Sequence, residues 1–176
     1  MANLAFSRLR SLEELAASRA AGLPRRDEVA RHWTALAYRL GEQSFVSPLE
    51  QVTEILPLPS LTRLPLAKPW VLGVANLRGE LTPVFDLRGF FGHGMVNQDS
   101  RARVLVARHD TWALGLLVSE SLGLRHFQVE ARRSLGRPLE GLEDYVTEEV
   151  AEPWRSWYIL DLRRLLQSSD ILHSSL

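Results

Sequence analysis

The chain has 176 residues, with 21 Lys and Arg against 21 Asp and Glu, so its formal net charge at pH 7 is zero. A zero balance excludes the strong whole-protein field that draws basic proteins to nucleic acid or anionic lipid, and the absence of cysteine excludes disulfides and thiolate metal sites. No apolar run approaches the roughly 20 residues of a membrane-spanning helix, and no signal peptide begins the chain. We therefore expect a cytoplasmic globular protein without direct membrane insertion, folded as one domain or as two small intertwined ones.

Residues 1–32 are expected to form an N-terminal arm with one short helix. Ser11 and Glu14 have the spacing of a capping box, in which each side chain satisfies a free backbone N–H group near the start of a helix. Gly22 and Pro24 then end the helix. The thin apolar stripe indicates a docked or partly ordered arm rather than an independent unit.

From Trp33 onward the apolar residues recur with period two, which predicts short β-strands. The first strands are expected over 34–40, 45–46 and 52–56. The segment 57–69 is too rich in proline for a helix or a central strand, so we expect it to wrap across the surface.

The stretch from Trp70 to Gly92 predicts two strands joined by a tight turn. An apolar run at 71–75 is followed by the polar residues 76–80 and a second apolar run. Gly79 supplies the backbone freedom that such a turn needs. Asp86 ends the second strand, where its carboxylate is expected to cap a short helix.

The second half of the chain repeats this pattern. Asp161, like Asp86, follows an apolar strand and precedes Leu-Arg, which indicates two similar β subdomains, unless a common tripeptide has recurred by chance. Short strands separated by turns every 8–12 residues favour barrels over an α/β sheet. The strands expected in this half cover 102–107, 112–118, 119–127, 145–147 and 157–160, with a long excursion at 129–144.

Catalytic chemistry finds little support in the sequence. The five histidines are scattered singly, and no nucleophile elbow, phosphate-binding loop or dinucleotide fingerprint is present. Glu80 and Asp86 are better explained as a turn residue and a helix cap than as an acid–base pair. The aromatic residues occupy apolar positions typical of a core rather than of platforms that stack nucleic-acid bases. We therefore expect no enzyme activity, no cofactor, no metal and no nucleic-acid partner.

Arg78 interrupts an apolar context beside Gly79. A guanidinium there can make a forked contact with a carboxylate or with carbonyl groups. Two compatible roles stay open: an intramolecular brace, for instance to Glu54, and a contact with a partner. A small-ligand or peptide-binding β-barrel in which Arg78 grips a carboxylate is an alternative function.

The sequence resembles the CheW family of chemotaxis coupling proteins over residues 33–167. Its most specific part is the run G-V-x-N-x-R-G-x-x-x-P-V-x-D-L at 73–87, with Glu-Ile upstream at 54–55. Further similar runs lie at 103–106, 114–118 and 159–162. The N-terminal arm and the form of the 74–92 stretch are most similar to the branch called PilI, which serves type IV pilus twitching motility.

The resemblance implies a mainly β fold of two intertwined five-stranded SH3-like barrels, and no enzymatic activity. The CheW-like domain would cover 33–168, with the first barrel over 33–92 and the second over 101–168 and with strands that can exchange between them. The implied partners are the regulatory domain of a CheA-type histidine kinase and the cytoplasmic tip of a methyl-accepting receptor. The implied location is the cytoplasm, at membrane-bound receptor arrays.

The resemblance also assigns site residues by position. The surface glutamate of the family falls on Glu54 and its turn arginine on Arg78, and both are associated with assembly of the signalling complex. Val52, Thr62 and Asn76 lie beside them and complete the expected protein-binding set.

Overall fold

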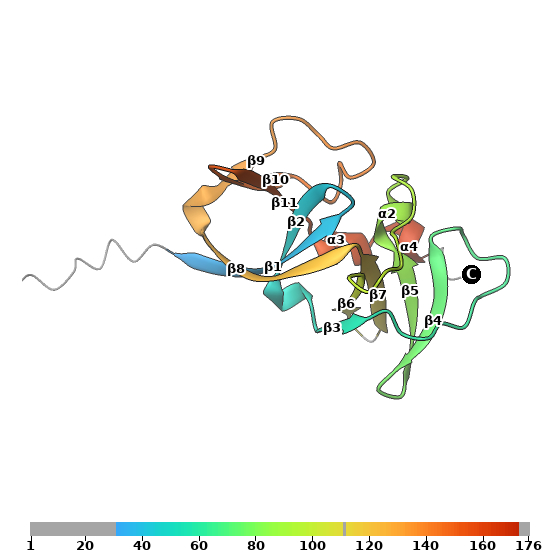
Figure 1. The fold of residues 1–176 in the computed structure, drawn as a ribbon. Coiled ribbons are helices and arrows are strands. Elements are labelled where there is room, and N and C mark those ends of the chain that lie inside the picture. Colours follow the sequence, from blue (N-terminus) through green and yellow to red (C-terminus); the bar gives the residue numbers. More distant parts are fainter. Residues whose placement is uncertain (1–30, 111, 173–176) are drawn as a thin grey trace, which may run out of the picture. The chain divides into compact units, whose positions relative to one another are not determined.

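Eleven β-strands in two sheets form the framework of the chain that the computed structural model describes, residues 31–110 and 112–172 (Figure 1). The predicted N-terminal helix, with its capping box at Ser11 and Glu14, lies outside the described residues. Three short helices, α2 (Leu87–Phe90), α3 (Leu162–Leu166) and α4 (Ser169–Leu172), complete this part of the chain. None of its helices is long and apolar enough to cross a membrane.

The first sheet has six strands in the order β8-β1-β2-β11-β10-β9. Although β8 and β9 stand at opposite ends of this order, only a 3-10 turn at Val129–Ala131 separates them along the chain. The sheet therefore curls until its two edges meet in one bent strand, so that its six strands form a five-stranded barrel. The bounds are β1 (His32–Leu40), β2 (Gln43–Pro48), β8 (Glu120–Gln128), β9 (Arg132–Ser134), β10 (Glu148–Glu152) and β11 (Arg155–Ile159).

The second sheet has five strands in the order β3-β6-β7-β5-β4. Its edges meet through the proline-rich segment that follows β3, in which the Thr62 N–H donates to the Val74 carbonyl (2.9 Å) and the Val74 N–H donates to the Thr62 carbonyl (2.8 Å). The proline-rich segment thus closes a second barrel. The bounds are β3 (Glu54–Pro57), β4 (Val71–Leu77), β5 (Glu80–Asp86), β6 (Arg103–His109) and β7 (Trp112–Val118).

Gly73 makes this closure possible. It lies at an irregularity in the β4–β5 register, has a φ of +143°, and a Cβ at this position would stand 2.4 Å from the Thr62 carbonyl oxygen. Only a residue without a side chain lets the backbone of Thr62 approach β4 so closely.

The fold class predicted from the sequence is confirmed: the chain is mainly β, with two curled sheets consistent with two SH3-like subdomains. Each sheet takes strands from both halves of the chain: the first combines β1 and β2 with β8–β11, and the second combines β3–β5 with β6 and β7.

One predicted strand is wrong. Residues 145–147 form no strand, and the chain enters β10 only at Glu148. Tyr145 instead packs its ring against Phe90 and Phe91, with ring centroids 6.2 and 5.8 Å apart, so its apolar character serves the core and not a sheet. The predicted excursion at 129–144 also contains a strand, β9, which its charged residues concealed.

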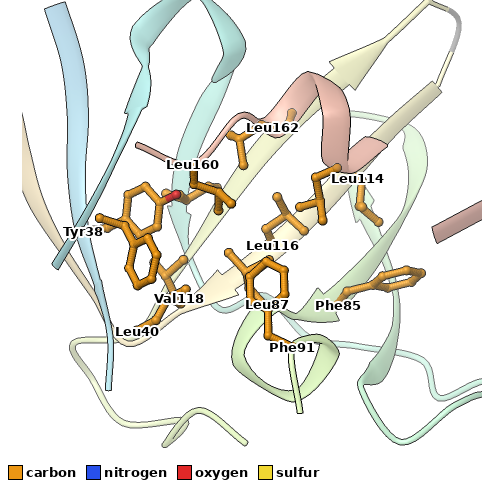
Figure 2. Packing of buried hydrophobic residues seen from close by; sticks show 14 of the residues in the cluster. Tyr38, Leu40, Phe85, Leu87, Phe91, Leu114, Leu116, Val118, Leu160 and Leu162 are labelled. Carbon is orange, nitrogen blue, oxygen red and sulfur yellow. The ribbon is translucent and has the colours of Figure 1, made fainter. Parts of the chain in front are cut away.

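Three apolar clusters hold the barrels together. One fills the first barrel, around Val46, Phe127 and Trp157, and another fills the second, around Val84, Val104 and Leu117. The third cluster, which we call the shared core, lies between the barrels and draws side chains from both sheets and the short helices (Figure 2). Its labelled members are Tyr38, Leu40, Phe85, Leu87, Phe91, Leu114, Leu116, Val118, Leu160 and Leu162.

Tyr38 brings the one hydroxyl of these labelled side chains into the shared core. Its hydroxyl lies 2.8 Å from the Ser47 hydroxyl, which donates to the Leu160 carbonyl at 2.8 Å. Complete burial raises the pKa of Tyr38, because the phenolate would lose its hydration there. The phenol is therefore neutral and ties β1 to β2, and Ser47 in turn ties β2 to Leu160, the residue that follows β11.

We expect Gly73→Ala to lower the free energy of unfolding by at least about 2 kcal/mol, because the new methyl group collides with the Thr62 carbonyl and the backbone is held at positive φ. Urea denaturation followed by circular dichroism measures the change. Gly136→Ala is the matched control, since a Cβ there meets no atom within 4 Å and should change the stability by less than about 0.5 kcal/mol. Equal effects of the two substitutions would contradict the closure through Thr62.

Candidate functional site

The turn between β4 and β5 consists of two residues, Arg78 and Gly79, between the paired residues Leu77 and Glu80. Their φ angles are +52° and +90°, the signature of a type I′ turn. The Asn76 side-chain oxygen accepts from the Gly79 N–H at 2.8 Å and steadies the turn. The predicted role of Gly79 is therefore borne out, and Arg78 shares the left-handed conformation.

Arg78 is an unfavourable choice for this backbone. Asn-Gly and Asp-Gly suit a type I′ turn, whereas a side chain such as that of arginine costs about 1 kcal/mol in the left-handed region. Such a strained residue gives reason to look for a function, because folding alone does not select it.

The Arg78 guanidinium reaches across the gap between the two edges of the second sheet. Its Nη2 donates to the Glu54 Oε1 of β3 at 2.9 Å, while the Arg78 side chain stays 82% exposed and that of Glu54 33% exposed. This contact is the intramolecular brace predicted from the sequence. An exposed ion pair contributes only about 0.2–1 kcal/mol to stability. This contact uses one of the five N–H donors of the guanidinium.

A second ion pair lies at the same end of the barrel. Arg108 of β6 contacts both carboxylate oxygens of Glu80, and this hydrogen bonding raises the pKa of Arg108 above its ordinary value. Side chains two or four residues apart lie on the same face of a strand. Arg108 therefore lies on the inner face with Val106, and Glu80 lies on the inner face with Val84. The two ion pairs therefore border the mouth of the second barrel, and we call their residues, Glu54, Arg78, Glu80 and Arg108, the charged rim.

Exposed apolar side chains stand beside the charged rim. Leu81 is 75% exposed and follows Glu80, and Ile55 is 41% exposed and follows Glu54. Charged groups bordering exposed apolar ones are typical of protein-binding surfaces, in which apolar contacts supply affinity and charges supply orientation.

The predicted site residues fall into two groups. Glu54, Arg78 and Asn76 lie together at the β4–β5 turn. Thr62 binds β4 at Val74, two residues before Asn76, whereas Val52 packs against the shared core. Arg108 was not among the predicted site residues, and Glu80 was predicted only as a turn residue. The alternation Val104, Val106, Arg108 is the signal that could have placed Arg108 at the mouth of the barrel.

Asp86 is fully buried, and backbone groups occupy its carboxylate. Oδ1 accepts from the Gly89 N–H and Oδ2 from the Val96 N–H, both at 2.8 Å, so Asp86 caps α2 and holds the following loop. Burial raises its pKa, and the backbone hydrogen bonds oppose that rise. Asp161 caps α3 in the same way, and it is more exposed. Within the described residues, no three His, Asp or Glu side chains are grouped to hold a metal ion.

Comparisons with known proteins point to one family. The family model of the CheW-like domain matches residues 34–170. Protein PilI of Pseudomonas aeruginosa is 35% identical over 167 residues, which cover 95% of this chain and 94% of that protein. Chemotaxis protein CheW of Klebsiella aerogenes is 27% identical over 139 residues, which cover 77% of this chain and 82% of that protein.

A solved structure shares the fold. The scaffolding protein TtCheW from Thermoanaerobacter tengcongensis superposes with a TM-score of 0.71 at 19% sequence identity, over 79% of this chain and 95% of that one. At this identity the likeness concerns the fold alone.

We expect Asp86→Ala to lower the free energy of unfolding by about 2–4 kcal/mol, because it leaves the backbone N–H groups of Gly89 and Val96 without an acceptor. Asp161→Ala is the matched control and should cost about 1 kcal/mol, since the N–H groups that Asp161 caps are exposed. Chemical denaturation of both variants measures the difference. A larger loss for Asp161→Ala would contradict the assignment of the buried cap to Asp86.

We expect Arg78→Asn to leave the free energy of unfolding within about 1 kcal/mol of its original value. Asparagine accepts the left-handed backbone more readily than arginine, and this gain offsets the loss of an exposed ion pair. Urea denaturation tests the expectation. A loss of more than about 2 kcal/mol would show that Arg78 serves the fold as a brace.

Proposed function

The chain belongs to the family of CheW-like domains, and on this premise we propose that it is a non-catalytic adaptor that links a methyl-accepting receptor to a CheA-type histidine kinase. Its expected place is the cytoplasm, at the tips of membrane-bound receptors. The identity with protein PilI over 95% of the chain supports a role in the control of type IV pilus twitching motility.

The observation that carries this proposal is the conformation of Arg78. The chain holds an arginine where the backbone disfavours it and leaves 82% of its side chain exposed. Glu54 fixes the direction of the guanidinium without occupying all of its donors. A carboxylate or a row of carbonyl groups on a partner protein can therefore accept the remaining hydrogen bonds.

The charged rim suits a protein partner better than a small carboxylate. Apolar side chains fill the interior of the second barrel, so the end of the barrel next to Arg78 is filled. The Arg78 side chain projects from this end into solvent and not into a cavity. Leu81 and Ile55 extend the surface on the outer side of the barrel. A partner that covers the rim would also strengthen its two ion pairs by excluding water.

The proposed mechanism is geometric. Receptor and kinase would each contact the adaptor, and the receptor would bias the kinase if the contacts differ in strength between the active and inactive states of the kinase. This mechanism requires no chemical reaction at any residue of the adaptor.

We expect the protein to bind a CheA-type regulatory domain, and Arg78→Asn to weaken that binding at least about tenfold, because hydrogen bonds of a charged group contribute about 1.5–3 kcal/mol. Isothermal titration calorimetry measures both affinities. Arg163→Gln removes another exposed arginine, on α3, and should leave the affinity unchanged.

Two results would contradict the proposal. The first is no association with the regulatory domain when both proteins are folded. The second is a rise in melting temperature with a small carboxylate ligand, lost in Arg78→Asn, while kinase binding is absent; that result favours the ligand-binding barrel.

A further inference from the structure

A hollow of about 490 Å³ lies at the end of the second barrel opposite the charged rim. The rim residues Glu54 and Arg78 stand where β3 begins and where β4 has ended, whereas the hollow borders the residues that follow β3 and the first residues of β4. Three leucines that also pack against the apolar cluster of this barrel line it: Leu58, Leu61 and Leu72. The barrel therefore gives the hollow an apolar and fixed floor.

The edge of the hollow carries positive charge. Arg63 and Lys68 of the proline-rich segment line it, both are exposed, and neither forms an ion pair with another described residue. No Asp or Glu of the described chain is among the lining residues, which include Gln98 and the 44% exposed Met95. The hollow thus combines apolar side chains with two cations that have no acidic partner.

Leu66 projects from the same proline-rich segment, two residues after Leu64, which lines the hollow. It is fully exposed and has a φ of +61°, a left-handed conformation that leucine rarely adopts. As with Arg78, folding alone does not select this residue at this position. Leu64 and Lys68 each precede a proline, which restricts their backbone to extended conformations, so the segment is stiff before anything binds.

We propose that the hollow docks an acidic amphipathic helix of a partner protein. Apolar side chains at positions i, i+3, i+4 and i+7 of such a helix would fill the hollow, and Met95 can adapt to their shapes. Carboxylates along one flank of the helix would meet Arg63 and Lys68, and Leu66 would extend the apolar contact. This docking does not depend on the adaptor role of the charged rim, which lies at the other end of the barrel.

Shape and charge favour such a helix over other occupants. A flat lipid surface would leave the hollow unfilled, and two cations attract anionic lipid only weakly. Within the described part of the chain, the helices α2, α3 and α4 have only four or five residues, too few for a second copy to offer an amphipathic stripe. A cationic partner would be repelled by Arg63 and Lys68.

Fluorescence polarisation with a designed peptide tests the proposal on the full chain. The probe is an N-terminally labelled helical peptide with leucines at i, i+3, i+4 and i+7 and glutamates along one flank. We expect a dissociation constant of about 100 µM or lower, and binding at least about tenfold weaker when arginines replace the glutamates. Leu66→Asn should weaken binding about tenfold without loss of stability, since asparagine accepts the left-handed backbone. Leu81→Asn, at an exposed leucine beside the charged rim, should leave the affinity unchanged.

Lys68 also locates the bound peptide, because it is the only lysine of the chain. Acetylation of its amine, followed by mass spectrometry, should slow in proportion to the fraction of chain that carries the glutamate peptide. A charge exchange gives an independent readout. The double variant Arg63→Glu with Lys68→Glu should bind the arginine peptide more tightly than the glutamate peptide, a reversal that a folding defect cannot produce.

Three results would each overturn the proposal: no saturable binding at about 1 mM peptide, equal affinities for the two peptides, or binding that leaves Lys68 unprotected. Peptide binding that appears only in the double variant Glu13→Arg with Glu14→Arg would assign the hollow to the N-terminal segment of the chain itself. Binding to phosphatidylglycerol vesicles, or dimerisation, that is lost in Leu66→Asn would assign it to lipid or to a second copy. Arg78→Asn should leave the peptide affinity unchanged, which separates a failure of this proposal from a failure of the adaptor role.

Discussion

The shared core between the barrels is the constraint on which the rest of the structure depends. A strand of an isolated barrel buries one face, but β1, β6 and β7 bury both: one face fills a barrel and the other joins the shared core. These strands therefore read as continuous apolar runs, such as 104–107 and 113–118, rather than as a strict alternation. The charged rim lies outside this packing, at the mouth of the second barrel.

Each barrel repeats one unit, a hairpin followed by a capping aspartate and a short helix. The helices carry Leu87 and Leu162 into the shared core, while the hairpin tips point away from it. The tips are consequently free of packing demands, and their sequences differ: one carries Arg78 and the other Trp154. The repeated fold thus supplies two similar supports for two chemically different turns.

Local rules predicted much of this architecture from the sequence. The β4–β5 turn follows from Gly79, and the strands of the barrels follow from apolar residues that either alternate or form short continuous runs between turns. The sequence could not reveal that Thr62 closes the second barrel, since this contact depends on how far the sheet curls. Nor could it pair Arg108 with Glu80, because the two residues lie on β6 and β5, which are separated by β7 in the sheet. The strand predicted at 145–147 is wrong because a half-buried tyrosine suits a turn against the core as well as a sheet.

Both hairpin tips depart from what folding alone would select. A left-handed backbone favours asparagine over Arg78, and an exposed turn favours a small polar residue over Trp154. Neither side chain is buried in compensation, yet the residues behind them are fixed: Asn76 holds one turn, and Trp157 anchors the other. A firm support beneath an exposed, locally unfavourable side chain is what a pre-organised contact requires, because binding then costs little conformational entropy. The shared core joins the two supports through Leu87 and Leu162, so the two tips keep a defined orientation relative to each other.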